Sequence, residues 1–170
     1  TLKELQDVAD GSIDIQTAGR ITFIRRMGKL SFAKLADIEG SIQIAVRQDI
    51  LGEEIYHVFQ KYIDIGDFIG VKGEVFTTHT GEKTIRVSEM TFLGKSLRPL
   101  PEKYHGINNV DACYRHRYLD LIMNNETKQR FLLRSKFIKS IRQYLDNKEY
   151  IEIETPILIN HPSGALAKPF

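Results

Sequence analysis

The fold is decided by residues 15–47, which read IQTAGRITFIRRMGKLSFAKLADIEGSIQIAVR. Within this stretch, residues 42–46 alternate isoleucine or valine with glutamine or alanine, and this period of two predicts a strand with one buried face. Gly28 and Gly40 each lie in a short segment typical of a tight turn. The stretch therefore predicts three consecutive strands joined by two hairpin turns.

The first of these strands is less regular than the third. Ile21 and Phe23 indicate its buried face, whereas Ile24 breaks the alternation. One extra residue in a strand of an antiparallel pair produces such a break, so we expect a β-bulge in this part of the strand.

Toward the C-terminus the pattern changes to a helix and then returns to strands. A short amphipathic helix is predicted over residues 50–63 from the spacing of its apolar residues, Leu51, Ile55, Val58, Phe59 and Tyr62. Two further strands are predicted over residues 68–77 and 83–93. Five strands with a helix between the third and fourth are the layout of an OB-fold barrel. An SH3-like or other small barrel is the alternative, and the helix favours the OB-fold.

A linker is predicted over residues 95–110, because Pro99 and Pro101 prevent regular structure there. We therefore expect an OB-fold domain at residues 1–94, this linker, and a segment of helices and one strand at residues 111–170. The expected fold class is mainly β plus α.

The segment after the linker is predicted to contain two helices and a strand. Asp111 is expected to cap the first helix, and Asn124 or the asparagine after it the second. The second helix carries an apolar stripe made of Leu133, Phe137, Ile141 and Tyr144. Residues 151–154 alternate like a strand that Pro156 ends.

Composition and charge limit the classes of protein to which the chain can belong. The 170 residues include 24 Lys and Arg, 22 Asp and Glu, and 42% hydrophobic residues, which is typical of a globular protein. Residues 1–94 hold 11 basic and 14 acidic residues, whereas residues 95–170 hold 13 and 8. Residues 15–47 are locally basic, a feature of polyanion-binding sites and equally of a solvated strand face.

Several classes of protein are excluded by what the residues lack. The single cysteine, Cys113, excludes an intrachain disulfide and a cysteine-built zinc site. The sequence has neither an apolar run near the roughly 18 residues of a membrane span nor a secretory signal, so we expect a cytoplasmic protein. The histidines have no metal-site spacing and the glycines form no phosphate-cradling loop. We therefore expect no metal site and no catalytic residues in this chain.

Nucleic-acid binding is the chemistry that the barrel residues favour. If Gly28 and Lys29 form a two-residue turn, Arg25 falls opposite Phe32, and Gln43 can share their face one strand away. OB-folds bind oligonucleotides on this face, where a ring can stack an unpaired base while an arginine and an amide read its edge. Each residue has an ordinary alternative, since Phe32 can belong to the core and Gln43 can simply face solvent.

Longer stretches resemble the class IIb aminoacyl-tRNA synthetases. The barrel residues 18–44 and 66–73 are similar to the anticodon-binding domain of that class. Four motifs carry a resemblance to its lysyl family and to class II motif 1: LRPLP at residues 97–101, YRHRYLDL at 114–121, IEIETP at 151–156 and SGALAKPF at 163–170. The aspartyl and asparaginyl families share the barrel, but these motifs fit the lysyl family better.

This resemblance implies roles for four residues of the barrel. Phe32 would stack the middle anticodon base, Arg25 and Gln43 would hydrogen-bond its edge, and Glu82 would accept from the ring N–H. Uracil suits this set, because it presents a carbonyl acceptor on either side of one N–H donor. The partner implied is the anticodon loop of lysine tRNA.

The resemblance also implies roles outside the barrel. Motif 1, which includes Pro156, forms the dimer interface in the family, and Gly164 matches a position that lines the lysine pocket. The parent protein would be a homodimeric lysine–tRNA ligase that uses ATP and Mg²⁺. Because motifs 2 and 3 of the family lie beyond Phe170, we expect this chain alone to bind neither cofactor and to be inactive as a ligase.

Two other functions compete with this one. The first is a stand-alone OB-fold protein that binds single-stranded nucleic acid, and the second is an interaction domain whose barrel binds another protein. Selective binding of an anticodon stem-loop would separate both from the synthetase hypothesis.

Overall fold

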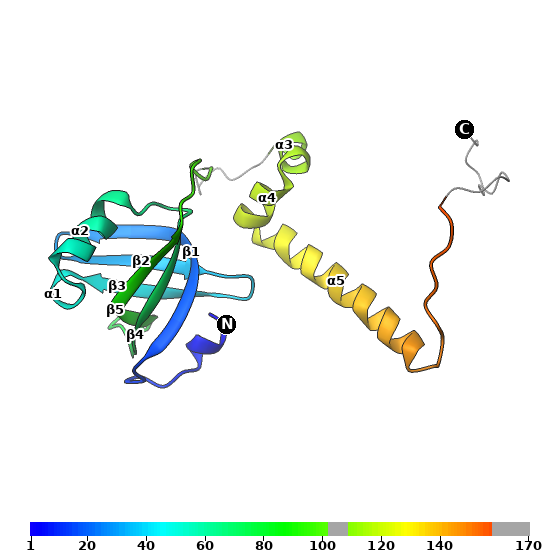
Figure 1. The fold of residues 1–170 in the computed structure, drawn as a ribbon, viewed down its shortest axis with the longest axis horizontal. Helices are drawn as coiled ribbons and strands as arrows, with labels where there is room; N and C mark the ends of the chain where they lie inside the picture. The colour runs from blue at the N-terminus through cyan, green and yellow to red at the C-terminus, as the bar shows by residue number, and fades with distance from the viewer. Residues whose placement is uncertain (102–108, 158–170) are drawn as a thin grey trace. The chain divides into compact units, whose positions relative to one another are not determined.

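The computed structural model describes residues 1–101 and 109–157. They belong to two compact units that divide after Pro101 (Figure 1). The elements of the first unit are the 3-10 helix η1 (Glu4–Gln6), β1 (Ile15–Met27), β2 (Leu30–Ala36), β3 (Ser41–Arg47), α1 (Gln48–Leu51), α2 (Glu53–Tyr62), β4 (Phe68–Thr77) and β5 (Lys83–Gly94).

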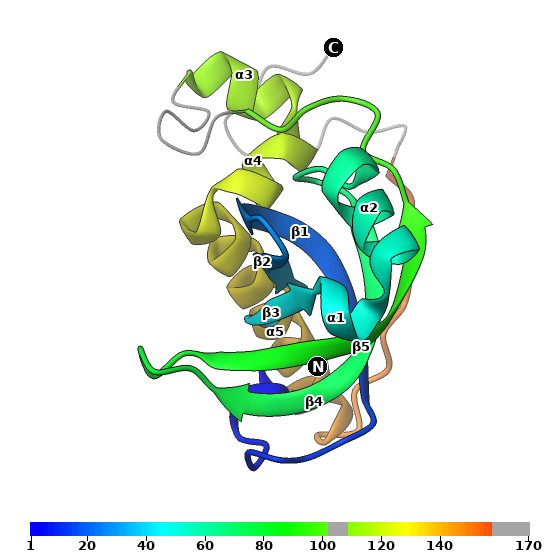
Figure 2. The ribbon, with the colours of Figure 1, turned by 90° about the vertical axis from the view of Figure 1, so that its left-hand side faces the viewer.

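The five strands close into a barrel in the order β1-β2-β3-β5-β4, and β4 pairs back onto β1. Neighbouring strands are antiparallel except β3 and β5, which are parallel. The helices α1 and α2 follow β3 and lie at one end of the barrel (Figure 2). This topology confirms the predicted OB-fold.

The core lies inside the barrel and is built from alternate residues of every strand. Its fully buried side chains include Ile21, Leu35, Ile42, Ile44, Val46, Ile69, Val75, Ile85 and Val87. From outside the strands, Leu2 and Phe59 are also fully buried in this cluster. The N-terminal segment and α2 therefore contribute to the same core as the strands.

The predicted β-bulge in β1 is present, but it changes which residues are buried. The register against β2 shifts between Ile21 and Phe23. Because a bulge adds one residue to its strand, the residues after it change face. Phe23 is consequently 46% exposed, whereas Ile24 packs against the core. The prediction that Phe23 lies on the buried face is wrong.

The predicted helix over residues 50–63 consists of two helices. They are separated at Gly52, whose φ of 88° lies in the left-handed region that favours glycine. The break resets the helical phase, so α2 buries Tyr56 and Phe59 while Ile55 and Val58 are exposed. The predicted apolar face was therefore correct for Leu51 and Phe59 and wrong for Ile55, Val58 and Tyr62, which are exposed.

Asp67 ties the chain that follows β5 to the barrel. Its carboxylate is fully buried and accepts hydrogen bonds of 2.8 Å from the main-chain N–H groups of Asp64 and Ser96 and from Lys95 Nζ. Burial alone would raise the pKa of Asp67, but the hydrogen bonds from Lys95 and the two amides lower it below its ordinary value. The first two residues of the predicted linker are therefore fixed on the barrel.

The second unit contains α3 (Val110–Arg115), α4 (Arg117–Met123) and α5 (Asn125–Asp146). The first helix predicted here is thus broken at His116. The residue that caps α3 is Asn109, whose side chain accepts from the N–H of Ala112 at 3.0 Å. Asp111 lies inside the first turn and pairs with Arg115 at 2.8 Å, so its prediction as the cap is wrong.

Asp120 joins α4 to the start of α5. It is 2% exposed, forms an ion pair with Arg117, and accepts from Asn124 Nδ2 at 2.7 Å. Burial would raise the pKa of Asp120, but hydrogen bonds from Asn124, Thr127 and Arg117 hold it below its ordinary value. Part of the YRHRYLDL motif is therefore used to connect two helices.

The predicted long helix is confirmed as α5, with Asn124 at the N-cap position. Its apolar stripe is exposed, and Leu133, Phe137 and Tyr144 are each more than 60% exposed. The strand predicted over residues 151–154 is wrong, because the described part of the chain offers these residues no partner strand and a strand needs one. No described helix is long and apolar enough to span a bilayer.

Candidate nucleic-acid interface

We define the outer face as the outward-pointing residues in the middle of β1, β2, β3 and β5. They are Phe23, Arg25, Phe32, Lys34, Gln43, Ala45, Thr84 and Arg86. The residues that alternate with them, such as Leu35, Ile44 and Ile85, are fully buried in the core. The period of two along each strand therefore gathers the outer set on one side of the barrel wall.

Arg25 and Phe32 are direct cross-strand partners on this face. The turn at Gly28 pairs Met27 with Leu30, and this register places Arg25 opposite Phe32, as the two-residue turn predicts. Phe32 is partly exposed, so it does not belong to the core. Arg25 is exposed and forms no hydrogen bond or ion pair with the described residues. Its guanidinium is consequently available to a ligand.

Gln43 is held by the neighbouring parallel strand. Its Nε2 donates to Thr84 Oγ1 at 2.9 Å. Thr84 is fully buried, and its hydroxyl donates in turn to the main-chain oxygen of Glu82 at 3.1 Å. Because an amide nitrogen carries two hydrogens, Gln43 keeps one N–H and its carbonyl oxygen for a ligand.

Glu82 lies in the loop between β4 and β5, which its own hydrogen bonds hold in shape. Thr78 donates its N–H to the Glu82 oxygen at 3.0 Å and accepts from the Glu82 N–H at Oγ1, also at 3.0 Å. The Glu82 carboxylate is 3.7 Å from Lys34 Nζ. Because Lys34 pairs with Gln43 across β2 and β3, Glu82 reaches the outer face beside Gln43. The fold thus brings Arg25, Phe32, Gln43 and Glu82 together.

The outer face also contains residues that the sequence analysis did not single out. Arg86 lies opposite Ala45, with its guanidinium 4.8 Å from the Phe76 ring centroid and 2.9 Å from a Glu74 carboxylate oxygen. Strand parity, counted from the buried Ile85, could have placed Arg86 outward. Parity places Thr84 outward as well, but it could not have predicted the contact with Gln43, which is 41 residues away in the chain.

Some of the basic residues in the stretch 15–47 bind the protein itself. Arg20 donates to the main-chain oxygen of Gly66 at 3.1 Å, and Arg26 donates to that of Ile63 at 2.6 Å. These two guanidinium groups brace the chain between α2 and β4. The positive charge of the predicted basic stretch is therefore only partly directed to a ligand.

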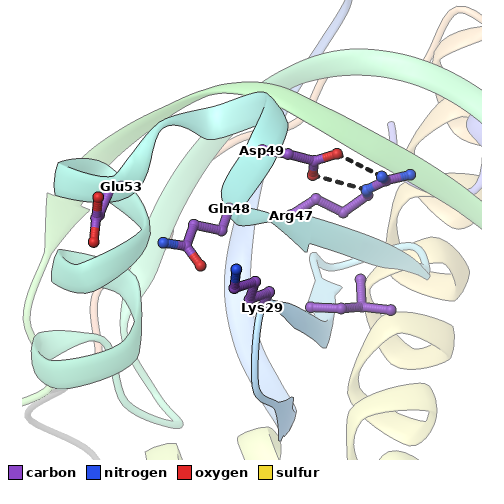
Figure 3. Close-up of a pocket in the computed structure, with 6 residues that line it drawn as sticks. Lys29, Arg47, Gln48, Asp49 and Glu53 are labelled. Atoms are coloured by element: carbon purple, nitrogen blue, oxygen red, sulfur yellow. Dashed lines mark hydrogen bonds and ion pairs between the residues drawn. The ribbon is translucent and has the colours of Figure 1, made fainter.

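An open hollow of about 620 Å³ adjoins the outer face where Leu30 pairs with Arg47 (Figure 3). Its other lining residues are Lys29, Gln48, Asp49 and Glu53. Arg47 donates two hydrogen bonds to Asp49, at 3.0 and 2.6 Å, which raise the pKa of Arg47 and lower that of Asp49. Two acidic and two basic side chains line the hollow, so it offers a polyanion less attraction than the outer face.

A buried polar network supports the hairpin that carries Arg25 and Phe32. The Tyr56 hydroxyl donates to the main-chain oxygen of Gly28 at 2.7 Å and lies 3.0 Å from Ser31 Oγ. Gln60 Nε2 donates to both hydroxyl oxygens, at 2.7 and 2.9 Å. The helix α2 thereby fixes the turn and the residue next to Phe32.

The remaining predicted site residues lie in the second unit. Pro156 is exposed. Gly164 lies outside the described residues. Within the residues that are described, no three His, Cys, Asp or Glu side chains are grouped as metal ligands.

Each of the two units matches a known protein family. Residues 15–93 match the family of OB-fold nucleic acid binding domains, and residues 109–170 match the class II tRNA synthetases for D, K and N. The two matches together cover the barrel and the second unit. The first unit is therefore similar to OB-fold nucleic acid binding domains, and the second unit is similar to class II tRNA synthetases.

Individual relatives are more specific than these two family matches. The chain is 50% identical to the lysine–tRNA ligase of Enterococcus faecalis over 97% of its own length and 33% of the relative. It is 54% identical to that of Streptococcus pneumoniae over 90% of the chain and 31% of the relative, and 50% identical to that of Lactococcus lactis over the whole chain and 34% of the relative. The chain is thus similar to lysine–tRNA ligases over nearly its whole length, and it spans about a third of the length of these relatives.

Proposed function

We propose that this chain carries the anticodon-recognition part of a lysine–tRNA ligase. The barrel, at residues 1–94, would bind the anticodon loop of lysine tRNA on its outer face. Residues 95–110 would link it to the beginning of the catalytic domain at residues 111–170. The observation that supports this most directly is the gathering of a partly exposed ring, an arginine, an amide and a carboxylate on one face of an OB-fold.

The chemistry of these four side chains fits a middle uracil. Phe32 provides a face on which the base can stack, an interaction worth about 1–3 kcal/mol. Arg25 and the remaining N–H of Gln43 are donors that suit the two uracil carbonyls. Glu82 is an acceptor that suits the ring N–H, and cytosine would present a lone pair at that position.

The charge on Lys34 strengthens this assignment. Its ammonium attracts the Glu82 carboxylate across 3.7 Å, and both side chains are about 40–45% exposed. The loop and the sheet are thus joined at the edge of the site. The carboxylate is thereby kept near the position where the base edge would lie.

Other roles follow from the family and concern the whole enzyme. It would activate lysine with ATP and Mg²⁺ and transfer it to tRNA, in the cytoplasm. Pro156 would take part in the homodimer interface, and Gly164 would line the lysine pocket. Because the chain spans a third of its relatives, we expect no lysine-dependent exchange of pyrophosphate into ATP from these 170 residues alone.

The alternative of a stand-alone nucleic-acid-binding protein is not favoured, since the second unit matches class II tRNA synthetases. The proposed function is tested by measuring the affinity of the 170-residue chain for two RNA stem-loops that differ in one base. The anticodon UUU should bind more tightly than UCU. Equal affinities would refute the assignment of the outer face to the anticodon.

A further inference from the structure

Thr84 contacts two of the residues proposed to read the base. Its Oγ1 accepts from Gln43 Nε2 at 2.9 Å, and its hydroxyl hydrogen is donated to the main-chain oxygen of Glu82 at 3.1 Å. The side chain is fully buried although its position on β5 faces outward. It therefore lies beneath the site, between β3 and the loop that carries Glu82.

The hydrogen bonds of Thr84 favour one orientation of the Gln43 amide. A hydroxyl has one hydrogen, and that of Thr84 is already used for the Glu82 oxygen. If the amide were rotated by a half-turn, the Thr84 hydroxyl could donate to the Gln43 carbonyl oxygen only by giving up its hydrogen bond to the Glu82 oxygen, which also accepts from the N–H and the hydroxyl of Thr78. The observed orientation, with Nε2 toward Thr84, is the one that keeps both hydrogen bonds of Thr84.

We propose that Thr84 is a positioning residue that sets base discrimination by fixing the Gln43 amide, an inference that rests on the proposed function. In the observed orientation, the second Nε2 hydrogen can be donated to a carbonyl of the base. A rotated amide would instead offer its oxygen, which suits the exocyclic amino group of cytosine. Thr84 thereby favours uracil over cytosine without touching the base.

The test compares two substitutions that differ in the hydroxyl group. Thr84→Val keeps the branched shape and removes the hydroxyl, whereas Thr84→Ser keeps the hydroxyl. The affinities of the 170-residue chain for the UUU and UCU stem-loops give the discrimination ratio of each variant. We expect Thr84→Val to lower this ratio about 2- to 10-fold, the range for one neutral hydrogen bond, and Thr84→Ser to stay within about twofold of the original.

A structural role alone would lower both affinities together and leave their ratio unchanged. The pair Thr84→Val and Gln43→Ala adds a second check, because the discrimination effects of two coupled residues are not additive. Once Gln43 is removed, Thr84→Val should change the ratio little further. Additive effects would overturn the inference.

A measurement on the unaltered protein covers the case in which Thr84→Val does not fold. In the NMR spectrum, one of the two Nε2 hydrogens of Gln43 should exchange with solvent more slowly than those of the exposed Gln16. Equal exchange rates for the Nε2 hydrogens of Gln43 and Gln16 would overturn the inference. If the unaltered chain binds the UUU and UCU stem-loops equally, the proposed function is wrong. If the unaltered chain prefers UUU and Thr84→Val keeps the same discrimination ratio, only the role of Thr84 is wrong.

Discussion

Lys34 on β2 and Glu82 in the β4–β5 loop form an ion pair, with 3.7 Å between Nζ and the carboxylate oxygen. This pair joins residues that are far apart in the sequence and lies at the edge of the outer face. Its position explains how a loop residue reaches a face that is otherwise built on strands.

Substitution of Glu82 should reduce base selectivity. Glu82→Gln keeps the size of the side chain but adds N–H donors, which can bond to the ring nitrogen of cytosine. We expect binding of the UUU stem-loop to weaken by about 1–2 kcal/mol, the low part of the range for a charged hydrogen bond, because Glu82 is half-exposed. Affinity for UCU should rise relative to UUU. The control is Glu89→Gln, an exposed carboxylate paired with Lys72, and identical selectivity in the two variants would contradict the role of Glu82.

Removal of the Phe32 ring should weaken RNA binding more than it weakens the fold. Phe32→Ala is expected to cost about 1–3 kcal/mol in affinity for the UUU stem-loop, the value for one stacked base. Phe92→Ala is the matched control, because Phe92 is 50% exposed on a part of β5 that pairs with Ile69. The affinity of both variants for the UUU stem-loop is measured by titration with labelled RNA. Equal losses of affinity in Phe32→Ala and Phe92→Ala would exclude a stacking role for Phe32.

Asp67 should make the stability of the barrel sensitive to acid. Because its pKa is lower in the folded state than its ordinary value of 3.8, the ionised carboxylate stabilises the fold. This contribution is fully present above pH 3.8 and is lost as the pH falls through the lower folded pKa. Asp67→Asn should therefore be less stable at neutral pH and lose less stability on acidification. The free energy of unfolding in urea is measured between pH 7 and pH 2.5, with Asp7→Asn at an exposed position as the control. The same pH dependence in both variants would refute the role of Asp67.

Two glycines of β4 should respond differently to a methyl group. A Cβ on Gly73 would lie 2.0 Å from the main-chain oxygen of Arg86, whereas a Cβ on Gly70 would have its nearest neighbour, a Leu93 methyl carbon, at 3.6 Å. Gly73→Ala forces β5 to move beside the outer face, and we expect it to lower the free energy of unfolding by about 2–4 kcal/mol. Gly70→Ala should change it by less than about 1 kcal/mol. Chemical denaturation measures the free energy of unfolding of both variants. Similar losses of stability would contradict the importance of the close approach between Gly73 and the Arg86 main chain.

Local features of the sequence determined much of this protein. The two-residue turn at Gly28 predicts the register of its hairpin, so the pairing of Arg25 with Phe32 could be derived without a structure. Strand periodicity likewise predicted the OB-fold, and the motifs along the chain predicted the lysyl family. These features depend on neighbours within a few residues or on a residue pattern, and both are visible in a sequence.

The tertiary structure decided where distant segments meet and which faces they bury. The bulge in β1 moved Phe23 out of the core, and the break at Gly52 changed the buried face of α2. The parallel pairing of β3 with β5 placed Thr84 beneath Gln43, a contact between residues 41 positions apart. Closure of a barrel sets such contacts through the packing of the whole core, and no local pattern contains that information.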